Sequence, residues 1–282
     1  MKAFGFTSNS SDPVLFEQAT PQATGRDLLI AVEAIAVNPV DTKVKASISQ
    51  SLITPKIIGW DAVGTVIEAG ENVELFNVGD RVFYAGDVGR SGCYASHQLV
   101  DERIVGSAPK SLSAEQTAVM PLTSLTAWEA LFSRLRINAD LDAGKNILII
   151  GGAGGVGSIA IQLAKKIAKL NVITTASRAE SEQWCTDQGA DHVINHHGDL
   201  ILQYRSLGLA YPDYILCLNN TDRHFTSMAE LIAPQGMICS IVGTQEKHDL
   251  DCLKSKSAGF VWEFMFTRPM FKTNDMAQQH RI

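Results

Sequence analysis

The sequence NILIIGGAGGVGSIAIQLAKK, from Asn146 to Lys166, decides the fold that we predict for this chain. Asn146 to Gly151 is a short, branched apolar run, which predicts a buried strand. The residues from Ser158 onward predict a helix, because apolar side chains recur at helical spacing. One apolar face is expected to hold Ile159, Leu163, Ile167 and Leu170. Between strand and helix lies a turn made almost entirely of glycine.

The turn matches G-x-G-x-x-G between a strand and a helix, the context in which this pattern indicates dinucleotide binding. We expect Gly152 to adopt a backbone conformation that other residues avoid, and Gly154 to let a pyrophosphate approach the chain. Gly157 would let the helix pack on the strand. The first amides of the helix would then face the phosphates. The predicted phosphate-binding residues are Gly152, Ala153, Gly154, Gly155, Val156 and Gly157.

Two other interpretations of this stretch compete with dinucleotide binding. A tight turn with small-residue packing needs no ligand, but the flanking strand and helix favour the dinucleotide site. A membrane span is suggested by the 18 uncharged residues from Ile147 to Ala164. Such a span needs ~20 mostly apolar residues, and the five glycines here would make a poor helix. We therefore expect no membrane partner.

The composition limits the class of protein. The chain has 282 residues and a net charge of −6, so it can form two domains and is not expected to bind nucleic acid. The N-terminus has no apolar segment typical of a secretory signal, so a cytoplasmic location is the default. The cysteines are odd in number and form no C-x-x-C pair, which argues against disulfides and structural zinc. They are Cys93, Cys185, Cys217, Cys239 and Cys252.

Two patterns follow each other along the chain. Residues 1 to about 120 contain short alternating runs separated by turn residues, which predict a small β-barrel. Strand candidates lie within Asp27–Asp41, Ile57–Gly70 and Asn77–Gly86, with turns at Asn38-Pro39 and Gly79-Asp80. A helix with Leu125, Trp128, Leu131, Phe132 and Leu135 at helical spacing is expected to bridge into the second domain.

After the glycine turn, strands alternate with helices, which predicts a parallel, doubly wound sheet and an α/β fold. Ala258–Phe266 is a candidate for one more edge strand, apolar enough to suggest a homodimer. The other strands are expected within Asn171–Ser177, Asp191–Asn195, Tyr214–Asn220 and Gly236–Gly243, and the helices within Ala179–Gln188 and Asp222–Ala233.

Short motifs extend this pattern to nearly the whole chain. Around the glycine turn they are Gly144-Lys145, Leu148, Gln162 and Lys165. Elsewhere they are Asn38 to Thr42, Gly59 to Gly64 with Val66 and Gly70, Val78 to Val82, Leu122 to Trp128, and TASRAESEQW followed by GADHVINH. With these motifs the chain resembles the quinone oxidoreductase branch of the medium-chain dehydrogenase/reductase superfamily. The last two phrases are similar to a bacterial subgroup commonly labelled zinc-binding alcohol dehydrogenase.

The resemblance implies an N-terminal GroES-like β-barrel domain followed by a Rossmann domain. We expect the GroES-like catalytic domain over residues 1–122 and the dinucleotide-binding domain over 123–267. Residues 268–282 would begin the segment with which family members return to their first domain. The chain ends inside this segment and is expected to be shorter than its relatives.

The resemblance does not extend to zinc ligands. The zinc enzymes of the superfamily have a cysteine near the position of Asp41, a His-Glu pair after that of Gly59, and a four-cysteine lobe. Here Trp60-Asp61 follows Gly59, and the cysteines are not clustered. Because zinc needs three or four converging ligands, we predict no metal site and disfavour zinc-assisted alcohol oxidation.

The end of the second strand predicts which nucleotide binds. An Asp or Glu about 20 residues past the glycines usually holds a free ribose 2′-OH, but Ser177 and Arg178 stand there. A hydroxyl and a guanidinium suit a 2′-phosphate, so we predict NADP(H). Ser177 with Glu180 also forms a capping-box pattern, and Arg178 alone would be an ordinary surface charge. The resemblance places His196 beside the adenine or the 2′-phosphate, although a surface histidine is equally compatible.

The resemblance also implies residues near the nicotinamide. It places Asn38, Thr123 and Thr126 near the ring, with Leu218, Asn219 and Gly243 at the strand ends behind it. The alternative for the two threonines is a hydroxyl bonded to the helix backbone, and the alternative for Asn38 is a plain Asn-Pro turn.

The expected reaction is hydride transfer to an electron-poor acceptor, with the protein supplying position and electrostatics. Asn38 could donate a hydrogen bond to the acceptor carbonyl, and Asp41 or Thr42 could order a water that delivers the proton. For Asp41 we prefer a capping role, and Tyr94 is a candidate for lining the acceptor pocket. We therefore predict an NADPH-dependent, zinc-independent reductase of quinones or α,β-unsaturated carbonyls. A zinc alcohol dehydrogenase and a non-catalytic NADPH-binding protein remain alternatives.

Arg178→Ala tests the nucleotide assignment. It should raise the Michaelis constant for NADPH about tenfold or more and hardly change that for NADH, because only NADPH has the phosphate that pairs with a guanidinium. Steady-state kinetics with both nucleotides measure this. Equal effects on the two nucleotides would refute the assignment.

Overall fold

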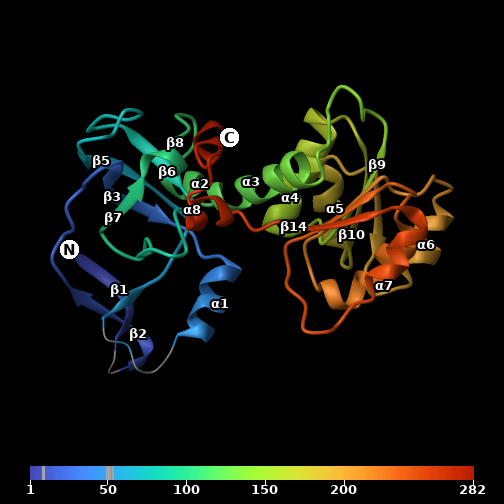
Figure 1. Ribbon diagram of the computed structural model, residues 1–282, viewed down its shortest axis with the longest axis horizontal. Coiled ribbons are helices and arrows are strands. Elements are labelled where there is room, and N and C mark those ends of the chain that lie inside the picture. The colour runs from blue at the N-terminus through green and yellow to red at the C-terminus, as the bar shows by residue number, and fades with distance from the viewer. Residues whose placement is uncertain (8–9, 49–51, 53) are drawn as a thin grey trace. The chain divides into compact units, whose positions relative to one another are not determined.

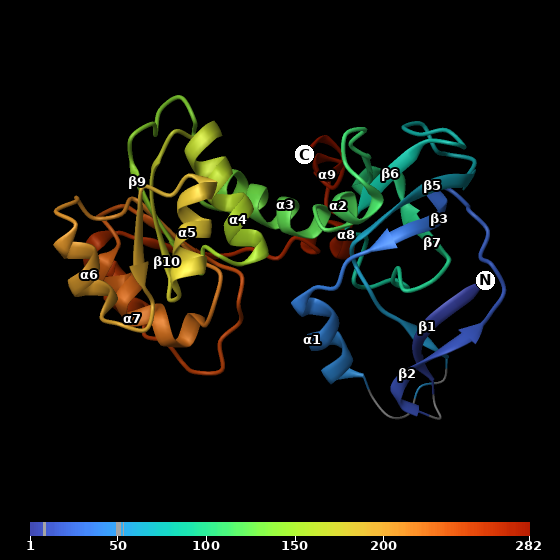
Figure 2. The same ribbon diagram turned by 180° about the vertical axis from the view of Figure 1, so that it is seen from behind.

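A computed structural model describes residues 1–7, 10–48, 52 and 54–282 of the chain. The chain divides into two compact units, shown in Figures 1 and 2. Unit 1 contains Met1–Leu125 and Met265–Ile282, and unit 2 contains Thr126–Phe264. The sequence-based boundaries lie a few residues away, after residues 122 and 267.

Unit 2 is built on a six-stranded sheet with the order β11-β10-β9-β12-β13-β14. All neighbouring strands are parallel, which confirms the predicted doubly wound α/β fold. β14 lies at one edge, as expected for the apolar segment near residue 260. The strands are β9 (Asn146–Ile150), β10 (Asn171–Ala176), β11 (His192–Asn195), β12 (Tyr214–Cys217), β13 (Met237–Ser240) and β14 (Gly259–Trp262).

Helices lie on both faces of this sheet (Figure 1). Alternate residues of the central strand β9 enter different cores: Ile147 and Ile149 join one, while Leu148 and Ile150 join the other. Because both faces are covered, the strand is apolar throughout instead of alternating. The helices are α4 (Gly155–Gln162), α5 (Ala179–Gln188), α6 (Leu200–Ser206) and α7 (Thr221–Leu231). α6 was not predicted.

The predicted apolar face of α4 is only partly right, because Leu170 is buried but Ile167 is not. The helix begins at Gly155, three residues earlier than expected, and continues as a π-helix over Leu163–Ile167. Ile167 is 47% exposed, and Ile159 and Leu163 are only partly buried. The fully buried face is instead made largely of small residues, because the helix approaches the sheet closely; it contains Gly157, Ala160, Ile161, Ala164 and Ala168.

The glycine turn also differs in detail from the prediction. The left-handed residue is Gly151, with φ +92°, and not Gly152. Gly152 is required for space, because a Cβ there would collide with Thr174 Oγ1. A Cβ on Gly157 would lie 2.5 Å from the carbonyl oxygens of both Gly151 and Gly152. The predicted close packing of helix on turn is therefore confirmed at Gly157.

Unit 1 consists of two antiparallel sheets with the orders β2-β1-β4 and β7-β3-β5-β6-β8, in agreement with the predicted GroES-like domain. The turn at Gly79-Asp80 is confirmed, since Asp80 N donates to Asn77 O and Gly79 has φ +98°. The strands are β1 (Lys2–Thr7), β2 (Ser10–Glu17), β3 (Asp27–Ile35), β4 (Lys56–Ile57), β5 (Ala62–Ala69), β6 (Arg81–Tyr84), β7 (His97–Asp101) and β8 (Gly106–Ser107).

Asn38-Pro39 is the start of a helix, which corrects the predicted turn. Pro39 is the first residue of α1 (Pro39–Ser47), a position that suits proline because the first helical amide has no partner within the helix. The other helices of unit 1 are α2 (Ala114–Ala118), the first part of α3 (Pro121–Trp128), α8 (Thr267–Phe271) and α9 (Gln278–Arg281).

The C-terminal residues 265–282 pack within unit 1. Met276 belongs to its core, and the ring of His280 hydrogen-bonds Val105 O at 2.7 Å. Gln279 Nε2 donates to Met265 O at 2.6 Å, inside the same segment. No helix among the described residues is long and apolar enough to cross a membrane.

Gly152→Ala should destabilise the protein by about 1–3 kcal/mol, because the added methyl group meets Thr174 in a close-packed turn. Chemical unfolding measures this difference. Gly154→Ala is the matched control, since a Cβ there comes no closer than 3.6 Å to the neighbours considered. Equal stability of the two variants would contradict the packing explanation.

Candidate functional site

The glycine turn lies at the carboxyl end of β9 and opens α4. Gly154 is the N-cap residue, and no side chain caps the helix. Ala153, Gly154 and Gly155 are exposed, and Val156 is partly buried. The first amides of a helix lack partners within it and attract anions. The turn is therefore suited to bind a phosphate group.

Gly154 distinguishes a ligand-binding turn from a merely compact one. Gly152 and Gly157 are glycines because neighbouring atoms leave no room for a side chain. At Gly154 the nearest atom to an added Cβ is Gly151 O at 3.6 Å, which is ordinary contact, and its φ of −77° suits any residue. Among the described residues, no neighbouring atom excludes a side chain there, although glycine also suits an N-cap position. The absent side chain is explained if a ligand approaches this position.

The strand ends next to the turn bring the predicted 2′-phosphate residues together. Ala176 of β10 pairs with Asn195 of β11, so Ser177 and Arg178 leave the sheet beside His196. The Arg178 side chain is exposed and makes no hydrogen bond or ion pair with the described residues. This guanidinium is therefore available to an anionic ligand.

The predicted capping box of Ser177 with Glu180 is wrong. The N-cap residue of α5 is Arg178, one position later. The Ser181 hydroxyl accepts a hydrogen bond from Arg178 N at 3.2 Å and donates one to Arg178 O at 2.8 Å. Because Ser181 provides the cap, the Ser177 hydroxyl is not needed for it.

His196 is partly buried beside a second histidine ring, with 4.5 Å between the ring centres of His196 and His197. Burial, together with the positive charges of His197 and Arg223, lowers the pKa of His196. Its Nδ1 atom is buried and has no hydrogen-bond partner among the described residues. The ring is therefore held neutral, with one nitrogen unused.

The residues of unit 2 predicted near or behind the nicotinamide differ in their surroundings. Leu218 N donates to Ile150 O at 2.9 Å, and the Cβ atoms of Leu218 and Asn219 are the nearest neighbours of a Cβ placed on Gly151. These two residues therefore border the glycine turn. Gly243 is exposed, with no neighbouring atom within 4 Å of an added Cβ. Thr126 is buried in α3.

Unit 1 contains a buried polar cluster around Asn38. Asn38 N donates to Asp41 Oδ2 at 2.6 Å, which confirms the capping role preferred for Asp41. Asn38 Nδ2 donates to Asp61 Oδ2 at 2.8 Å, and Tyr94 Oη donates to Asp41 Oδ2 at 3.0 Å. Asp61 Oδ1 accepts from Leu122 N at 2.8 Å. The predicted residues Asn38, Asp41 and Tyr94 are thus joined through side-chain hydrogen bonds.

Burial changes the acid–base properties of this cluster. It raises the pKa of Asp61, which is 1% exposed, to about 8. It also raises the pKa of Asp41, and burial together with the Asp41 carboxylate raises that of Tyr94. Asp41 Oδ1 is buried with no hydrogen-bond partner among the described residues. A carboxyl with a raised pKa and an unused oxygen is a reasonable proton-transfer group.

The two predicted threonines of unit 1 bond to backbone carbonyls. Thr42 Oγ1 donates to Pro39 O at 2.8 Å on the exposed side of α1. Thr123 Oγ1 lies 3.1 Å from Met120 O and 3.2 Å from Val119 O. The backbone-bonded alternative therefore describes Thr123, and the Thr42 hydroxyl is bonded in a similar way, although each oxygen keeps lone pairs that can accept a hydrogen bond.

Asp61 is the member of this cluster that was not predicted as a site residue. The signal was present, because a carboxylate stands inside the otherwise apolar sequence GWDAVG. A charged residue in a buried run needs partners, and the two amide donors supply them. Only the fold shows that these donors come from Asn38 and Leu122.

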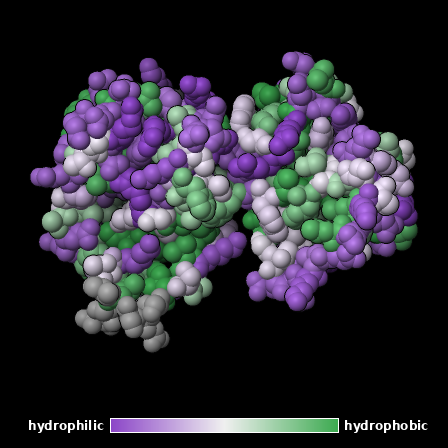
Figure 3. All heavy atoms as spheres, in the orientation of Figure 1, coloured by the Kyte–Doolittle hydropathy of each residue, from purple (hydrophilic) through white to green (hydrophobic). Residues whose placement is uncertain are grey.

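An open pocket of about 490 Å³ in unit 1 reaches the ring of Tyr94. Its wall is mostly apolar and includes Phe4, Ile35, Val37 and Cys93. Val37 is 73% exposed and directly precedes Asn38. Figure 3 shows apolar residues at the surface of unit 1. The pocket therefore offers an apolar ring-sized space next to polar groups.

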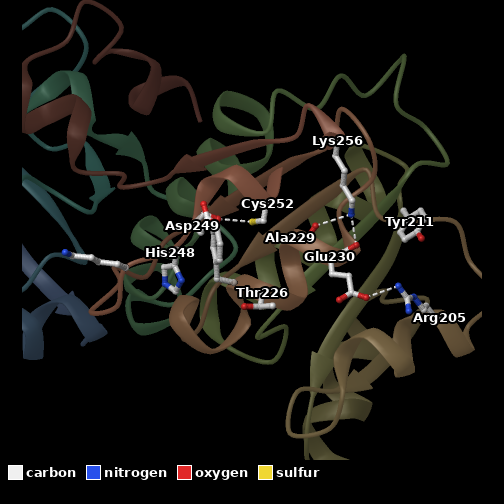
Figure 4. A pocket seen from close by; sticks show the side chains of 11 residues that line it. Arg205, Tyr211, Thr226, Ala229, Glu230, His248, Asp249, Cys252 and Lys256 are labelled. Atoms are coloured by element: carbon white, nitrogen blue, oxygen red, sulfur yellow. Dashed lines mark hydrogen bonds and ion pairs between the residues drawn. The ribbon is translucent and has the colours of Figure 1, made fainter. Parts of the chain in front are cut away.

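A pocket of about 600 Å³ in unit 2, shown in Figure 4, contains none of the predicted residues. It lies among α6, α7 and residues 247–256. Arg205 pairs with Glu230 at 2.9 Å, and Lys256 Nζ donates to the carbonyls of Ala229, Glu230 and Ile232. Lys256 thus completes the C-terminal end of α7. Since these charges have internal partners, we assign this pocket no role in the site.

The sheet, the glycine turn and the separate β domain define a nucleotide-binding dehydrogenase. Two family descriptions match: "Alcohol dehydrogenase GroES-like domain" over residues 24–122 and "Zinc-binding dehydrogenase" over residues 155–265. A zinc-type alcohol dehydrogenase-like protein of Staphylococcus aureus is 48% identical over 269 residues, which cover 94% of this chain and 79% of that protein. The chain belongs to the medium-chain dehydrogenase/reductase superfamily, in the family of the zinc-type alcohol dehydrogenase-like proteins.

Solved structures share this fold. A putative zinc-dependent alcohol dehydrogenase from Rhizobium etli is 45% identical with a TM-score of 0.93, and the match covers 100% of this chain and 83% of that one. A mycobacterial protein complexed with NADPH is 26% identical with a TM-score of 0.82, covering 99% of this chain and 85% of that one. The predicted family and fold are confirmed.

The residues present do not fit the zinc centre that the family names imply. No cysteine stands near Asp41, Trp60 follows Gly59 where the zinc enzymes have a histidine, and the Trp60 indole donates to Asp87 O at 3.1 Å. An indole N–H is a donor only and cannot bind zinc. Among residues 1–7, 10–48, 52 and 54–282, no group of three or more His, Cys, Asp or Glu side chains could hold a metal ion.

Asp61→Asn should destabilise the protein by about 1–3 kcal/mol near neutral pH, because the amide keeps one acceptor oxygen and presents N–H groups to the other of the two donors. The wild type should also lose stability as pH rises through about 8, where the buried carboxyl releases its proton. The variant has no such proton and should change less. Thermal unfolding at several pH values, with the exposed Glu17→Gln as control, measures both effects. Parallel pH profiles of the wild type and Asp61→Asn would show that Asp61 does not titrate there.

Proposed function

We propose that this oxidoreductase is an NADPH-dependent, zinc-independent reductase of quinones or α,β-unsaturated carbonyls. The observation that supports it best is the pairing of an open glycine turn with an exposed guanidinium. Gly154 leaves space beside the first amides of α4, and Arg178 lacks a partner among the described residues. A diphosphate and a 2′-phosphate together would use both features.

NADPH fits the residues present. The turn Gly152 to Gly157 would hold the pyrophosphate, and Ser177, Arg178 and His196 would hold the 2′-phosphate and the adenine. Thr123, Thr126, Leu218, Asn219 and Gly243 would border the nicotinamide. The bound nucleotide supplies the hydride. The NADPH complex of the mycobacterial neighbour supports this choice of nucleotide.

The groups of unit 1 suit the reduction of a conjugated carbonyl. Asn38 Nδ2 has a second N–H, besides the one donated to Asp61, which can bind a carbonyl oxygen as negative charge develops on it. Asp41, with its raised pKa and unpartnered Oδ1, can supply or relay a proton directly or through water. Thr42 can help to order that water. The apolar pocket beside Tyr94 favours an apolar acceptor such as a quinone.

Two further properties belong to this proposal. We infer a homodimer formed through β14, because this strand is at the edge of the sheet and Trp262 is 48% exposed. We place the protein in the cytoplasm, because all five cysteines are free thiols.

Gly154→Ala tests nucleotide binding without changing the fold. The methyl group should raise the dissociation constant for NADPH at least about tenfold, equivalent to about 1.4 kcal/mol, because it occupies the space of the pyrophosphate. Calorimetric titration measures the affinity, and thermal unfolding verifies that stability is unchanged. Unchanged affinity for NADPH would reject this site.

The substrate class is tested by the oxidation of NADPH in the presence of quinones, enals and simple aldehydes. We expect turnover with the first two classes, and none with saturated aldehydes. Tight binding of NADPH without turnover would indicate a non-catalytic binding protein instead. Stoichiometric zinc in protein purified without chelator would favour the alcohol dehydrogenase alternative.

A further inference from the structure

Unit 2 contains a buried charged triad outside the groups discussed above. Arg134 Nε donates to Glu263 Oε2 at 2.6 Å, and Arg134 Nη2 lies 3.9 Å from Glu129 Oε2. The side chains of Glu129 and Glu263 are both 0% exposed, whereas that of Arg134 is 31% exposed. Two acids thus share one cation in the interior. One negative charge is left over if both acids are ionised.

The contacts of the triad indicate that it holds a proton. Both carboxylates converge on one guanidinium, with Arg134 2.6 Å from Glu263 Oε2 and 3.9 Å from Glu129 Oε2. Glu263 Oε1 is buried and receives no N–H or O–H donor from the described residues. Two ionised carboxylates are both acceptors, so they cannot bond to each other. One proton on either acid provides the missing donor and removes the excess charge.

The charges near the triad agree with this assignment. Burial and the charge of Glu129 raise the pKa of Glu263 to about 7, against the opposing effect of Arg134. The thiol of Cys239 on β13 is a further titratable group near Glu263, and burial together with Glu263 raises its pKa, so it stays neutral. Arg134 is the cation that faces both acids among the described residues.

The triad lies where the chain enters and leaves unit 2. The chain enters between Leu125 and Thr126 and leaves between Phe264 and Met265. Glu129 and Arg134 lie on the π-helical continuation of α3, and Glu129 is one turn beyond Thr126. Glu263 directly follows β14, and its backbone N–H donates to Ser240 O at 2.9 Å. The triad therefore ties the helix that contains Thr126 to the end of the sheet.

We propose that Glu129, Arg134 and Glu263 are positioning residues that hold one proton and thereby fix Thr126 for binding of the nicotinamide nucleotide. This proposal rests on the function proposed above, because Thr126 is assigned there to the nicotinamide. None of the three residues is required to touch the nucleotide. Loss of the proton leaves two buried carboxylates with a single cation, which repel each other and loosen the turn that follows Thr126.

The sign of the pH effect follows from linkage. The reference pKa of a glutamate is 4.5, so the unfolded chain has released this proton near pH 6 while the folded triad still holds it. The stability contributed by the triad is therefore present at low pH and is lost as pH rises through about 7. Nucleotide affinity should decrease over the same range.

Glu263→Gln and Glu129→Gln are the test variants, since a glutamine amide replaces the protonated acid and donates to its neighbour at every pH. The matched control is Glu230→Gln, which alters an exposed glutamate paired with Arg205 at 2.9 Å. Thermal unfolding and calorimetric titration with NADPH would be carried out from about pH 6 to about pH 8.5.

We expect the thermal midpoint of the wild type to fall as the pH is raised across this range, by about 2–4 °C more than that of Glu263→Gln. The control Glu230→Gln should behave like the wild type. The dissociation constant for NADPH should rise about tenfold more in the wild type than in Glu263→Gln, the factor that corresponds to one pKa unit of coupling. Glu129→Gln should behave like Glu263→Gln, which keeps the test intact if one variant does not fold.

Three outcomes would overturn the proposal. Parallel thermal profiles of the wild type and both glutamine variants would mean that the triad does not titrate, whatever the protein binds. A flattened thermal profile with unchanged pH dependence of NADPH affinity would mean that the triad is structural only. Absence of NADPH binding in every protein would reject the proposed function and the positioning role together, while the thermal profiles would still report the proton.

Discussion

The contact between the first turn of α4 and the carbonyls of the glycine turn is the constraint on which unit 2 depends. Gly157 lies so close to Gly151 O and Gly152 O that a single methyl group would separate helix from strand. On the other side, the Thr174 side chain occupies the space that a Cβ on Gly152 would need. The Thr174 hydroxyl donates to Ile149 O at 2.8 Å. The turn, the helix and the strands β9 and β10 are therefore positioned by contacts that tolerate no side chain on Gly152 or Gly157.

This close packing has a functional consequence. Because the turn is held by Gly152 and Gly157, the backbone around Gly154 does not need to be supported by side chains. It can remain open to a ligand while the surrounding strands stay rigid. Leu218 and Asn219 border the same turn, and Ser177 and Arg178 leave the neighbouring strand. A binding surface formed by strand ends on a rigid sheet is typical of doubly wound folds.

Both units bury carboxyl groups, but they satisfy them differently. Asp61 receives two amide donors, one from Asn38 and one from the backbone of Leu122. Glu263 has Arg134 for one oxygen, and its other oxygen has no hydrogen-bond partner among the described residues. Burying a charge without partners costs free energy. The two donors to Asp61 stabilise the Asn38 cluster, whereas the Glu129–Arg134–Glu263 triad needs a bound proton to balance its charge.

Sequence periodicity alone determined the alternating strands and helices, the edge position of β14 and the location of the glycine turn between strand and helix, because these depend on local spacing and on residues without side chains. It did not determine which face of α4 is buried, since Ile159, Leu163 and Ile167 have the right spacing but small residues permit the closer approach. It also misplaced the cap of α5 by one residue and took the start of α1 for a turn. The partners of Asp61 and Glu263 are far away in the chain, so only the tertiary structure could bring together the hydrogen bonds that give these carboxyls their chemistry.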